Sequence, residues 1–528
     1  MKAGKWVIIA ALLGLVLGTV PVVGQVTVVW GEDNELATLD PRITQSRHEL
    51  QVIRQIFDSL ITLDENGKPV PWLAESWEIA PDYTWIQFKL REGIKFHDGT
   101  PCNAEAFKFT YDSIANPELG SQAAIDYLGP YKETVVIDEL TFRVVFTKPY
   151  AGMLSAFALS YLAPVSPTAI REHGDAWFSE HPIGTGPFKF VEWVRRDHVT
   201  LEKNPDYNWA PANALHQGPP YIDRLVFKII PENSTRVAAL ETGEIQVGDL
   251  IPPIDVQSFA SDPAFKVMLG RVAGVPVSMY LNTNRSPTDE LAVRRAVFYA
   301  LDRDRIVENV FFGFYRAAKS ILAQSTPCYW EGAEDLYPYD PARAEEILEQ
   351  AGWVDRDGDG IREKDGKRLE IYCPIIFKPD LMTAIQAELR KVGVLLKVDN
   401  VTKAMQDELI MNNQYEAGLV RWVATDPSVL RIILHSSNIP APGYFKFNWQ
   451  RYASEEIDRL LDEAEAAPTP QERCAIYERI QQIVLEQALI VPLQETTQTV
   501  VYDARLEGLR WEVGNYQVLF YDVKVTGE

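Results

Sequence analysis

The chain has 528 residues and a formal net charge of −23, with 46% hydrophobic and 24% charged residues. This length exceeds what one hydrophobic core supports, so we expect two or three folded lobes. The acidic excess argues against nucleic acid and anionic membrane surfaces as partners, because both bind through lysine and arginine.

The first 24 residues form a pattern typical of a secretory signal peptide. Lys2 and Lys5 give a basic start, residues 6–20 form an apolar run, and Gly24 is a small residue before the expected cleavage point. The run is shorter than the roughly 20 residues that span a bilayer, and an uncleaved anchor is the alternative. The pattern predicts that residues 1–24 are removed and that the mature protein is soluble in the periplasm or another extracytoplasmic space.

Strand and helix signals are mixed along the rest of the chain, which predicts a mixed α and β fold. Asn103 and Asp340 are placed as helix N-caps, and Pro341 suits a first helical position. We see no repeat and no flexible linker, so the lobes should be joined by short strands that act as a hinge. Strands are expected at residues 26–30, 83–90, 141–146, 225–231, 277–281 and 395–398, and helices at residues 49–61, 104–114, 236–241, 291–310, 341–351, 379–392, 455–466 and 471–489.

The four cysteines are Cys102, Cys328, Cys373 and Cys474. Their wide spacing, without a pair separated by two residues, argues against a metal site made of thiolates. In an oxidising compartment they could form one or two disulfides, and free buried thiols fit equally well.

Two stretches resemble catalytic motifs without completing them. His97 lies beside Asp98, yet Gly99 and Thr100 indicate a turn, and no Gly-x-Ser-x-Gly nucleophile motif is present. Residues 184–186 (Gly-Thr-Gly) suggest a phosphate loop but lack the lysine and hydroxyl residue of a Walker motif, so we interpret them as a backbone crossing between lobes. The sequence therefore predicts a protein that is not an enzyme, and a secreted hydrolase is the alternative from another class.

Residues 355–366 place acids at positions 1, 3, 5 and 9 of a loop, with glycine at position 6. Such an oxygen cluster suits a hard cation, so a Ca²⁺ site is expected here. Position 12 is Gly366 rather than the bidentate glutamate of an EF-hand, and a charged hairpin turn is the alternative. The four candidate ligands are Asp355, Asp357, Asp359 and Glu363.

Six segments, in this order and spacing, resemble the bacterial extracellular solute-binding proteins of family 5, which are the dipeptide and oligopeptide receptors of ABC importers. The resemblance covers essentially the whole mature chain. The segments are Thr38 to Pro41, Pro71 to Trp77, Phe88 to Pro101, Gly184 to Phe188, Val293 to Arg303 and Tyr339 to Ala344.

This resemblance implies a two-lobed periplasmic-binding-protein fold of type II with an extra subdomain. It also implies a monomer that docks on membrane permease subunits of an ABC transporter, with the chain crossing between lobes near Leu281 and Pro492. The implied division is residues 25–68, 183–280 and 492–528 for the first lobe, residues 69–182 for the extra subdomain and residues 281–491 for the second lobe.

The resemblance also implies a ligand cleft between the lobes. Trp422 would form one wall, and Glu35 and Ala37 match cleft-lining positions of peptide receptors. Thr425 stands where those receptors carry the aspartate that binds the α-amino group, and Asp426 follows one position later. A short peptide is the expected ligand, and an oligosaccharide, a nickel complex or an opine are the alternatives that this departure leaves open.

Overall fold

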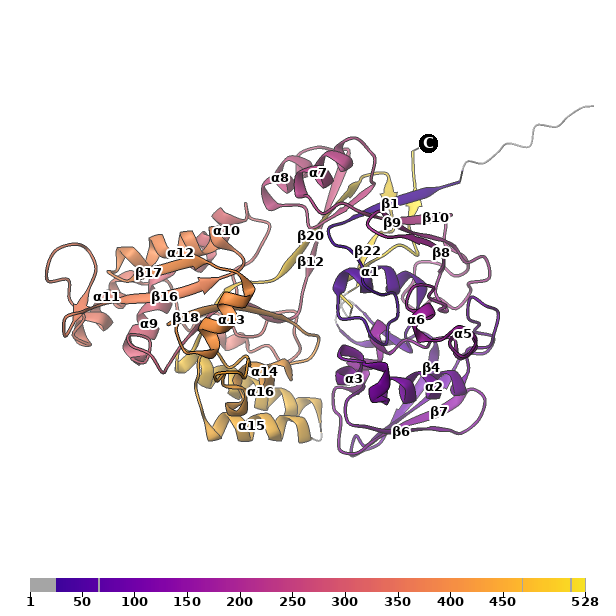
Figure 1. The fold of residues 1–528 in the computed structure, drawn as a ribbon, viewed down its shortest axis with the longest axis horizontal. Helices are drawn as coiled ribbons and strands as arrows, with labels where there is room; N and C mark the ends of the chain where they lie inside the picture. The colour runs from indigo at the N-terminus through magenta and orange to yellow at the C-terminus, as the bar shows by residue number, and fades with distance from the viewer. Residues whose placement is uncertain (1–24, 65–66, 468, 513–514, 528) are drawn as a thin grey trace, which may run out of the picture.

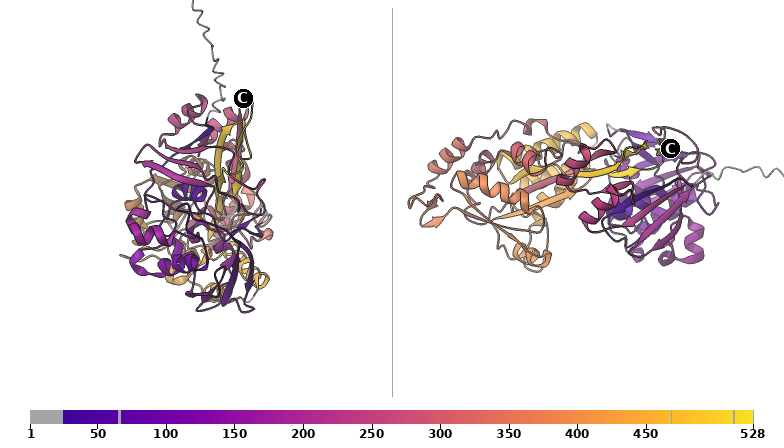
Figure 2. Two further views of the ribbon diagram at one scale, coloured as in Figure 1. Left: turned by 90° about the vertical axis from the view of Figure 1, so that its right-hand side faces the viewer. Right: turned by 90° about the horizontal axis from the view of Figure 1, so that it is seen from above.

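The computed structural model describes residues 25–64, 67–467, 469–512 and 515–527, so the expected signal peptide lies outside the described residues. Figure 1 shows two bodies side by side. One contains the N-terminal chain, in indigo to magenta, together with the yellow C-terminal strands, and the other is formed mainly by the chain drawn in orange. Strands β12 (Phe265–Arg271) and β20 (Thr497–Asp503) lie where the two bodies join. The view from above in Figure 2 shows the same division.

The first lobe is built on a seven-stranded sheet in the order β12-β20-β11-β1-β10-β9-β8. Strand β1 runs parallel to β10 and β11, and the remaining neighbours are antiparallel. Val28 and Trp30 of β1 are fully buried against the apolar face of helix α1. The bounds are β1 (Thr27–Glu32), β8 (Phe188–Val194), β9 (His198–Lys203), β10 (Arg224–Ile229), β11 (Val247–Asp249), α1 (Arg47–Ile56), α7 (Asn233–Glu241) and α8 (Pro253–Ala260).

The extra subdomain contains a four-stranded antiparallel sheet in the order β4-β5-β7-β6, with its own apolar core. Residues of β5 alternate between the core and the outside, as the sequence predicts. The side chain of Asn103 caps α2 by accepting from the backbone N of Ala106 at 3.2 Å, which is also as predicted. The bounds are β4 (Ala74–Ile79), β5 (Trp85–Leu90), β6 (Tyr131–Val136), β7 (Thr141–Phe146), α2 (Ala104–Ala115), α3 (Ala123–Leu128) and α4 (Met153–Phe157).

The second lobe has a three-stranded sheet, β18-β13-β19, and a parallel pair, β16-β17, surrounded by helices. Asp340 caps α11 and Pro341 begins it, as predicted. A disulfide joins Cys328 to Cys474, whereas Cys102 and Cys373 are buried free thiols. The bounds are β13 (Gly274–Leu281), β16 (Glu370–Ile375), β17 (Leu395–Asn400), β18 (Ala417–Val423), β19 (Ile490–Gln494), α9 (Leu291–Ala300), α10 (Arg303–Val310), α11 (Pro341–Gln350), α12 (Pro379–Lys391), α13 (Lys403–Met411), α14 (Val429–Leu434), α15 (Glu455–Ala466) and α16 (Pro470–Glu486).

Two short segments carry the chain between the lobes. One lies between β12 and β13, and the other between β19 and β20. They lie side by side, because the backbone N of Val272 donates to the carbonyl oxygen of Thr496 at 3.1 Å. Gly274 follows the first crossing at φ +115°, and a Cβ there would stand 2.2 Å from the carbonyl oxygen of Trp422. The two crossing segments, residues 272–273 and 495–496, are called the hinge below. The hinge therefore meets the end of β18 through backbone atoms.

Two expected boundaries need correction. The first crossing precedes β13, so the predicted division at residues 280/281 falls one strand late; β13 pairs with β18 and β19 and belongs to the second lobe. The second crossing, at residues 495–496 directly after β19, lies close to the position expected near Pro492. Helices α5 (Pro167–His173) and α6 (Asp175–Phe178) bury their apolar side chains in the first-lobe core, so the extra subdomain ends before residue 182.

The sequence suggested that the Gly-Thr-Gly segment at residues 184–186 crosses between the lobes, and this interpretation is wrong. The segment follows helix α6 and leads into β8 within the first lobe, and the backbone N of Gly186 donates to the carbonyl oxygen of Ile56 at 2.7 Å. A Cβ at Gly184 would lie 2.1 Å from that oxygen, so the motif serves a close backbone contact at the end of α1.

Candidate ligand-binding cleft

Two adjoining chambers lie between the lobes. The outer chamber, of about 940 Å³, lies between residues 122–130 and 148–156 of the extra subdomain and residues 422–432 of the second lobe. The inner chamber, of about 330 Å³, is lined by residues of the hinge, of α1 and of β18. The two share five lining residues, Gln45, Tyr127, Val423, Ala424 and Thr425. Both volumes are in the range of ligand sites, and both lobes contribute walls.

The last residues of β18 are divided between the chambers by the pleat of the strand. Arg421 faces the inner chamber, Trp422 the outer chamber, and Val423 reaches both. Trp422 is half-buried, and its ring meets Phe447 edge-on at 4.6 Å between centroids. Trp422, the predicted cleft wall, thus packs against the second-lobe core and also borders the outer chamber.

Thr425 and Asp426 also line the outer chamber, but Asp426 already has a cationic partner. Its two carboxylate oxygens each accept from a guanidinium nitrogen of Arg473 at 2.7 Å, and one accepts from the backbone N of Ser428 at 2.9 Å. Burial opposes ionisation of Asp426, yet the charge of Arg473 outweighs it and lowers the pKa of the carboxyl. In this arrangement Asp426 is neutralised before any ligand ammonium arrives.

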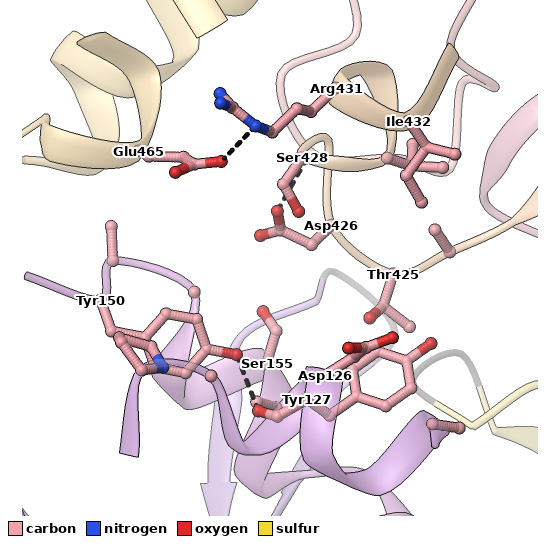
Figure 3. A pocket seen from close by; sticks show the side chains of 18 of the residues that line it. Asp126, Tyr127, Tyr150, Ser155, Thr425, Asp426, Ser428, Arg431, Ile432 and Glu465 are labelled. Carbon is pink, nitrogen blue, oxygen red and sulfur yellow. Dashed lines mark hydrogen bonds and ion pairs between the residues drawn. The ribbon is translucent and has the colours of Figure 1, made fainter. Parts of the chain in front are cut away.

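Figure 3 shows side chains of the extra subdomain facing those of the second lobe across the outer chamber. Among them is Asp126 of α3, which no pattern in the sequence marks as a ligand-binding residue. No hydrogen bond or ion pair holds its carboxylate within the described chain, and burial raises its pKa. The neighbouring Tyr127 and Tyr150 are linked by a hydrogen bond of 2.8 Å from the Tyr150 hydroxyl to the Tyr127 carbonyl oxygen. Asp126 is an acidic group left available to a ligand.

Glu35 and Ala37 lie on the exposed loop that follows β1, and neither is among the described residues that line the two chambers. The carboxylate of Glu35 accepts from the backbone N of Arg196 at 2.9 Å. The backbone N of Ala37 donates to Glu49 at 2.8 Å. The structure thus separates these two residues from Trp422, Thr425 and Asp426.

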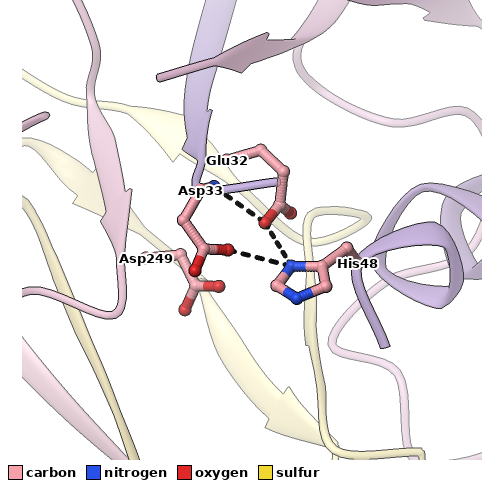
Figure 4. A group of neighbouring side chains, drawn as sticks. All are labelled: Glu32, Asp33, His48 and Asp249. Carbon is pink, nitrogen blue, oxygen red and sulfur yellow. Dashed lines mark hydrogen bonds and ion pairs between the residues drawn. The ribbon is translucent and has the colours of Figure 1, made fainter. Parts of the chain in front are cut away.

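A buried charge cluster lies at the hinge side of the first lobe (Figure 4). His48 Nδ1 is 2.6 Å from Glu32 Oε1 and 2.9 Å from Asp33 Oδ1. Burial alone lowers the pKa of His48, but its hydrogen bonds with Asp33 and Glu32 raise it to about 9. Asp249 accepts from both terminal nitrogens of Arg47 at 3.0 Å. These acids resemble a metal site in spacing, but imidazolium and guanidinium groups already balance them.

The acidic loop brings the four expected Ca²⁺ ligands together, with one oxygen from each lying within 4.8 Å of the others. These carboxylates also organise the turn, since Asp355 accepts from the backbone N of Gly358 at 2.8 Å and of Gly360 at 3.0 Å. Asp359 pairs with Arg368 at 2.6 Å. The loop fits both a cation site and the alternative of a charged hairpin, so calcium binding stays a prediction.

His97 is a structural residue within the extra subdomain. Its Nε2 lies 2.9 Å from the carbonyl oxygen of Gly186, and burial lowers its pKa to about 4, so the ring is neutral. It lies outside both chambers, whereas a catalytic base needs access to its substrate.

In the part of the chain that the structure describes, we find no helix with the length and apolar character needed to cross a membrane. The structure is similar to that of NikA from Brucella suis in complex with Fe(III)-EDTA, with a TM-score of 0.82, 24% identity and coverage of 95% of this chain and 100% of that one. This likeness confirms the expected type II periplasmic-binding-protein fold.

Two curated relatives match almost end to end. The glutathione-binding protein GsiB of Salmonella typhimurium is 27% identical over 501 residues, covering 93% of this chain and 92% of the relative. The nickel-binding periplasmic protein of Escherichia coli is 25% identical over 515 residues, covering 95% and 94%. The family model described as bacterial extracellular solute-binding proteins, family 5 Middle, matches residues 68–440. The chain therefore belongs to the family 5 extracellular solute-binding proteins, the ligand receptors of ABC importers.

Proposed function

We propose that this protein captures a short peptide or a peptide-like solute outside the cytoplasm and delivers it, as a monomer, to the permease of an ABC importer. The observation that carries this proposal is the pair of chambers enclosed by two bodies that two adjacent hinge segments connect. Closure of such bodies around a solute would replace its lost water contacts.

Several features favour a peptide over an oligosaccharide. Strand β18 lies at the edge of its sheet, so an extended peptide could pair with its backbone while side chains occupy the outer chamber. The lining also combines hydroxyl and amide groups with tyrosine rings. Among the relatives, GsiB is named for glutathione, which is itself a tripeptide. A sugar would use the same rings, whereas backbone pairing with the edge of β18 is open only to a peptide.

The test is retention of ligands from defined pools. The protein is incubated with separate pools of di- to tetrapeptides and of oligosaccharides, and retained molecules are identified by mass spectrometry. We expect peptides to be retained and the scattering profile to become more compact when they bind. Retention of sugars alone would overturn the peptide assignment, and chemical turnover of a retained peptide would revive the hydrolase alternative.

A matched pair of variants locates the site. Trp422→Ala removes a cleft wall and should weaken peptide binding about 10- to 100-fold, as expected for an aromatic anchor. Trp193→Ala removes a tryptophan on β8, which lies outside both chambers, and should leave affinity unchanged. Equal affinities of the two variants would contradict the proposed cleft.

A further inference from the structure

The inner chamber has a charge opposite to that of the whole protein. The chain carries a net charge of −23, yet the described residues that line this chamber include two arginines, Arg47 and Arg421, and no aspartate or glutamate. The rest of the lining is hydroxyl, amide, aromatic and aliphatic, with Thr425, Thr497 and Gln498 among the polar members. The chamber offers hydrogen-bond donors and positive charge together.

The two arginines differ in their partners. Arg47 is held by Asp249, and Asp33 lies 3.6 Å from its guanidinium. Arg421 has no ion pair within the described part of the chain, and its nearest ring contact is Phe377 at 5.9 Å from the centroid. Among the described residues, Arg421 is the cation of this chamber that lacks an acidic partner.

The surroundings of Arg421 oppose its charge rather than balance it. The Arg421 side chain is exposed to the cleft, yet partial loss of hydration, followed by the charge of Arg47, lowers its pKa. Lys378, at the start of α12, lies over the rings of Phe311 and Tyr315 at 4.7 and 5.4 Å. Burial and then the charge of Arg421 lower the pKa of Lys378 to about 8. Two arginines thus face the inner chamber, with Lys378 near Arg421 but outside the lining, and an anion placed between the arginines would relieve their repulsion.

We propose that the inner chamber binds a carboxylate of the ligand, with Arg421 as its principal partner. The proposal rests on the proposed function and narrows it: the transported solute carries a carboxylate and enters with that group toward the hinge. A guanidinium can donate two parallel hydrogen bonds to a carboxylate, and the neighbouring hydroxyl and amide groups can complete its coordination. At about 330 Å³ the inner chamber suits the end of a ligand whose remainder lies in the larger outer chamber.

The first experiment compares ligand forms on the whole protein. One pool of di- to tetrapeptides is prepared with free termini, a second with amidated C-termini and a third with acetylated N-termini. Wild type should retain the free and acetylated pools and bind the amidated pool about 10- to 100-fold more weakly, the range expected for a charge-assisted hydrogen bond. Equal retention of free and amidated peptides would overturn the carboxylate site while leaving the receptor function in place.

The second experiment changes the protein. Arg421→Met should lose most of the preference for a free carboxylate, and Arg421→Lys should keep part of it. Arg459→Met removes an exposed arginine of α15 that pairs with Glu463, and it should behave as wild type. Unchanged preference in Arg421→Met would overturn the assignment of Arg421.

A third measurement needs no ligand and separates a binding role from a structural one. Because Arg421 meets other cations and no carboxylate, Arg421→Met should unfold at the same temperature as wild type or higher. A clearly lower unfolding temperature would show that Arg421 supports the fold and would overturn its assignment as an unbalanced site. If wild type retained no pool and its scattering profile never changed, the proposed function and this inference would both fall.

Discussion

The two chambers share Tyr127 and Thr425 but balance their charges in different ways. In the outer chamber, Asp426 is neutralised by Arg473 and Arg431 pairs with Glu465, which leaves Asp126 as the unpaired acid. In the inner chamber, Arg47 is neutralised by Asp249 and Arg421 is left unpaired. The charges available to a ligand are those without a partner among the described residues, and they have opposite signs at the two ends of the cleft.

The largest expected effect comes from breaking the paired charge of the outer chamber. Arg473→Met leaves the carboxylate of Asp426 without its guanidinium, and this should lower the free energy of unfolding by about 2–4 kcal/mol, measured in urea. The double variant Arg473→Met with Asp426→Asn removes both charges and should recover much of that loss. A single variant as stable as wild type would show that the pair is not what neutralises Asp426.

The next effect tests whether the charged groups behind the inner chamber, His48 among them, are already balanced. The pKa of His48 in the folded protein, about 9, lies above its unfolded value near 6.5. This stabilisation is therefore fully present below about pH 6.5 and is lost as the pH rises through 9. Between pH 7 and 9.5, wild type should lose about 2 kcal/mol of unfolding free energy through this group.

The matched variant for this pH dependence is His48→Gln. It keeps a polar side chain but cannot titrate, so its unfolding free energy should change less over the same pH range. Burial raises the pKa of Glu32 to about 7, so this group is about half titrated at pH 7 and affects the slope only in the lowest part of the window. Identical slopes for wild type and His48→Gln would contradict an imidazolium in the cluster.

A smaller effect tests the unpaired acid of the outer chamber. Asp126→Asn should weaken binding of peptides with a free amino terminus about 3- to 10-fold and leave acetylated peptides unchanged, because only the free amine carries a charge. Asp112→Asn removes an acid that Lys108 and Tyr131 already engage on α2, and it serves as the control. Loss of affinity for both peptide forms would count against a specific ammonium contact.

The smallest effect concerns a region outside both chambers. Calcium should bind the loop at residues 355–366 with a Kd on the order of 10⁻⁴–10⁻³ M, and Asp357→Asn should weaken it. Asp365→Asn, in the same loop but outside the converging group, should bind as wild type. If titration calorimetry detects no heat when calcium is added, a charged hairpin turn explains these acids better than a calcium site.

Local signals in the sequence predicted much of the fold. Asn103 and Asp340 cap the expected helices because capping depends on a few neighbouring residues. The wall position of Trp422 followed from a resemblance that covers the whole chain, and the structure places it at the outer chamber. Strand β13 was assigned to the wrong lobe because a buried strand pattern does not reveal which sheet it joins.

The charge pattern of the cleft was harder to predict. Asp426 stands one position after the expected anchor, and nothing in the sequence indicated that it pairs with Arg473, 47 positions later. Arg421 and Asp126 carry no motif, since what distinguishes them is the lack of a partner among the described residues. Whether a charge is paired depends on tertiary contacts that sequence spacing does not encode.

The glycine beside the hinge has a consequence for how this receptor can evolve. At Gly274 the crossing segment lies against the carbonyl of Trp422, and Ala424 donates its backbone N–H to the carbonyl of Ala273 at 3.1 Å. The hinge and the end of β18, where we propose that the solute binds, are therefore in direct backbone contact. If the lobes close around the solute as proposed, a substitution that reshapes the end of β18 should also change that closure, so selectivity and transport rate should change together in descendants of this chain.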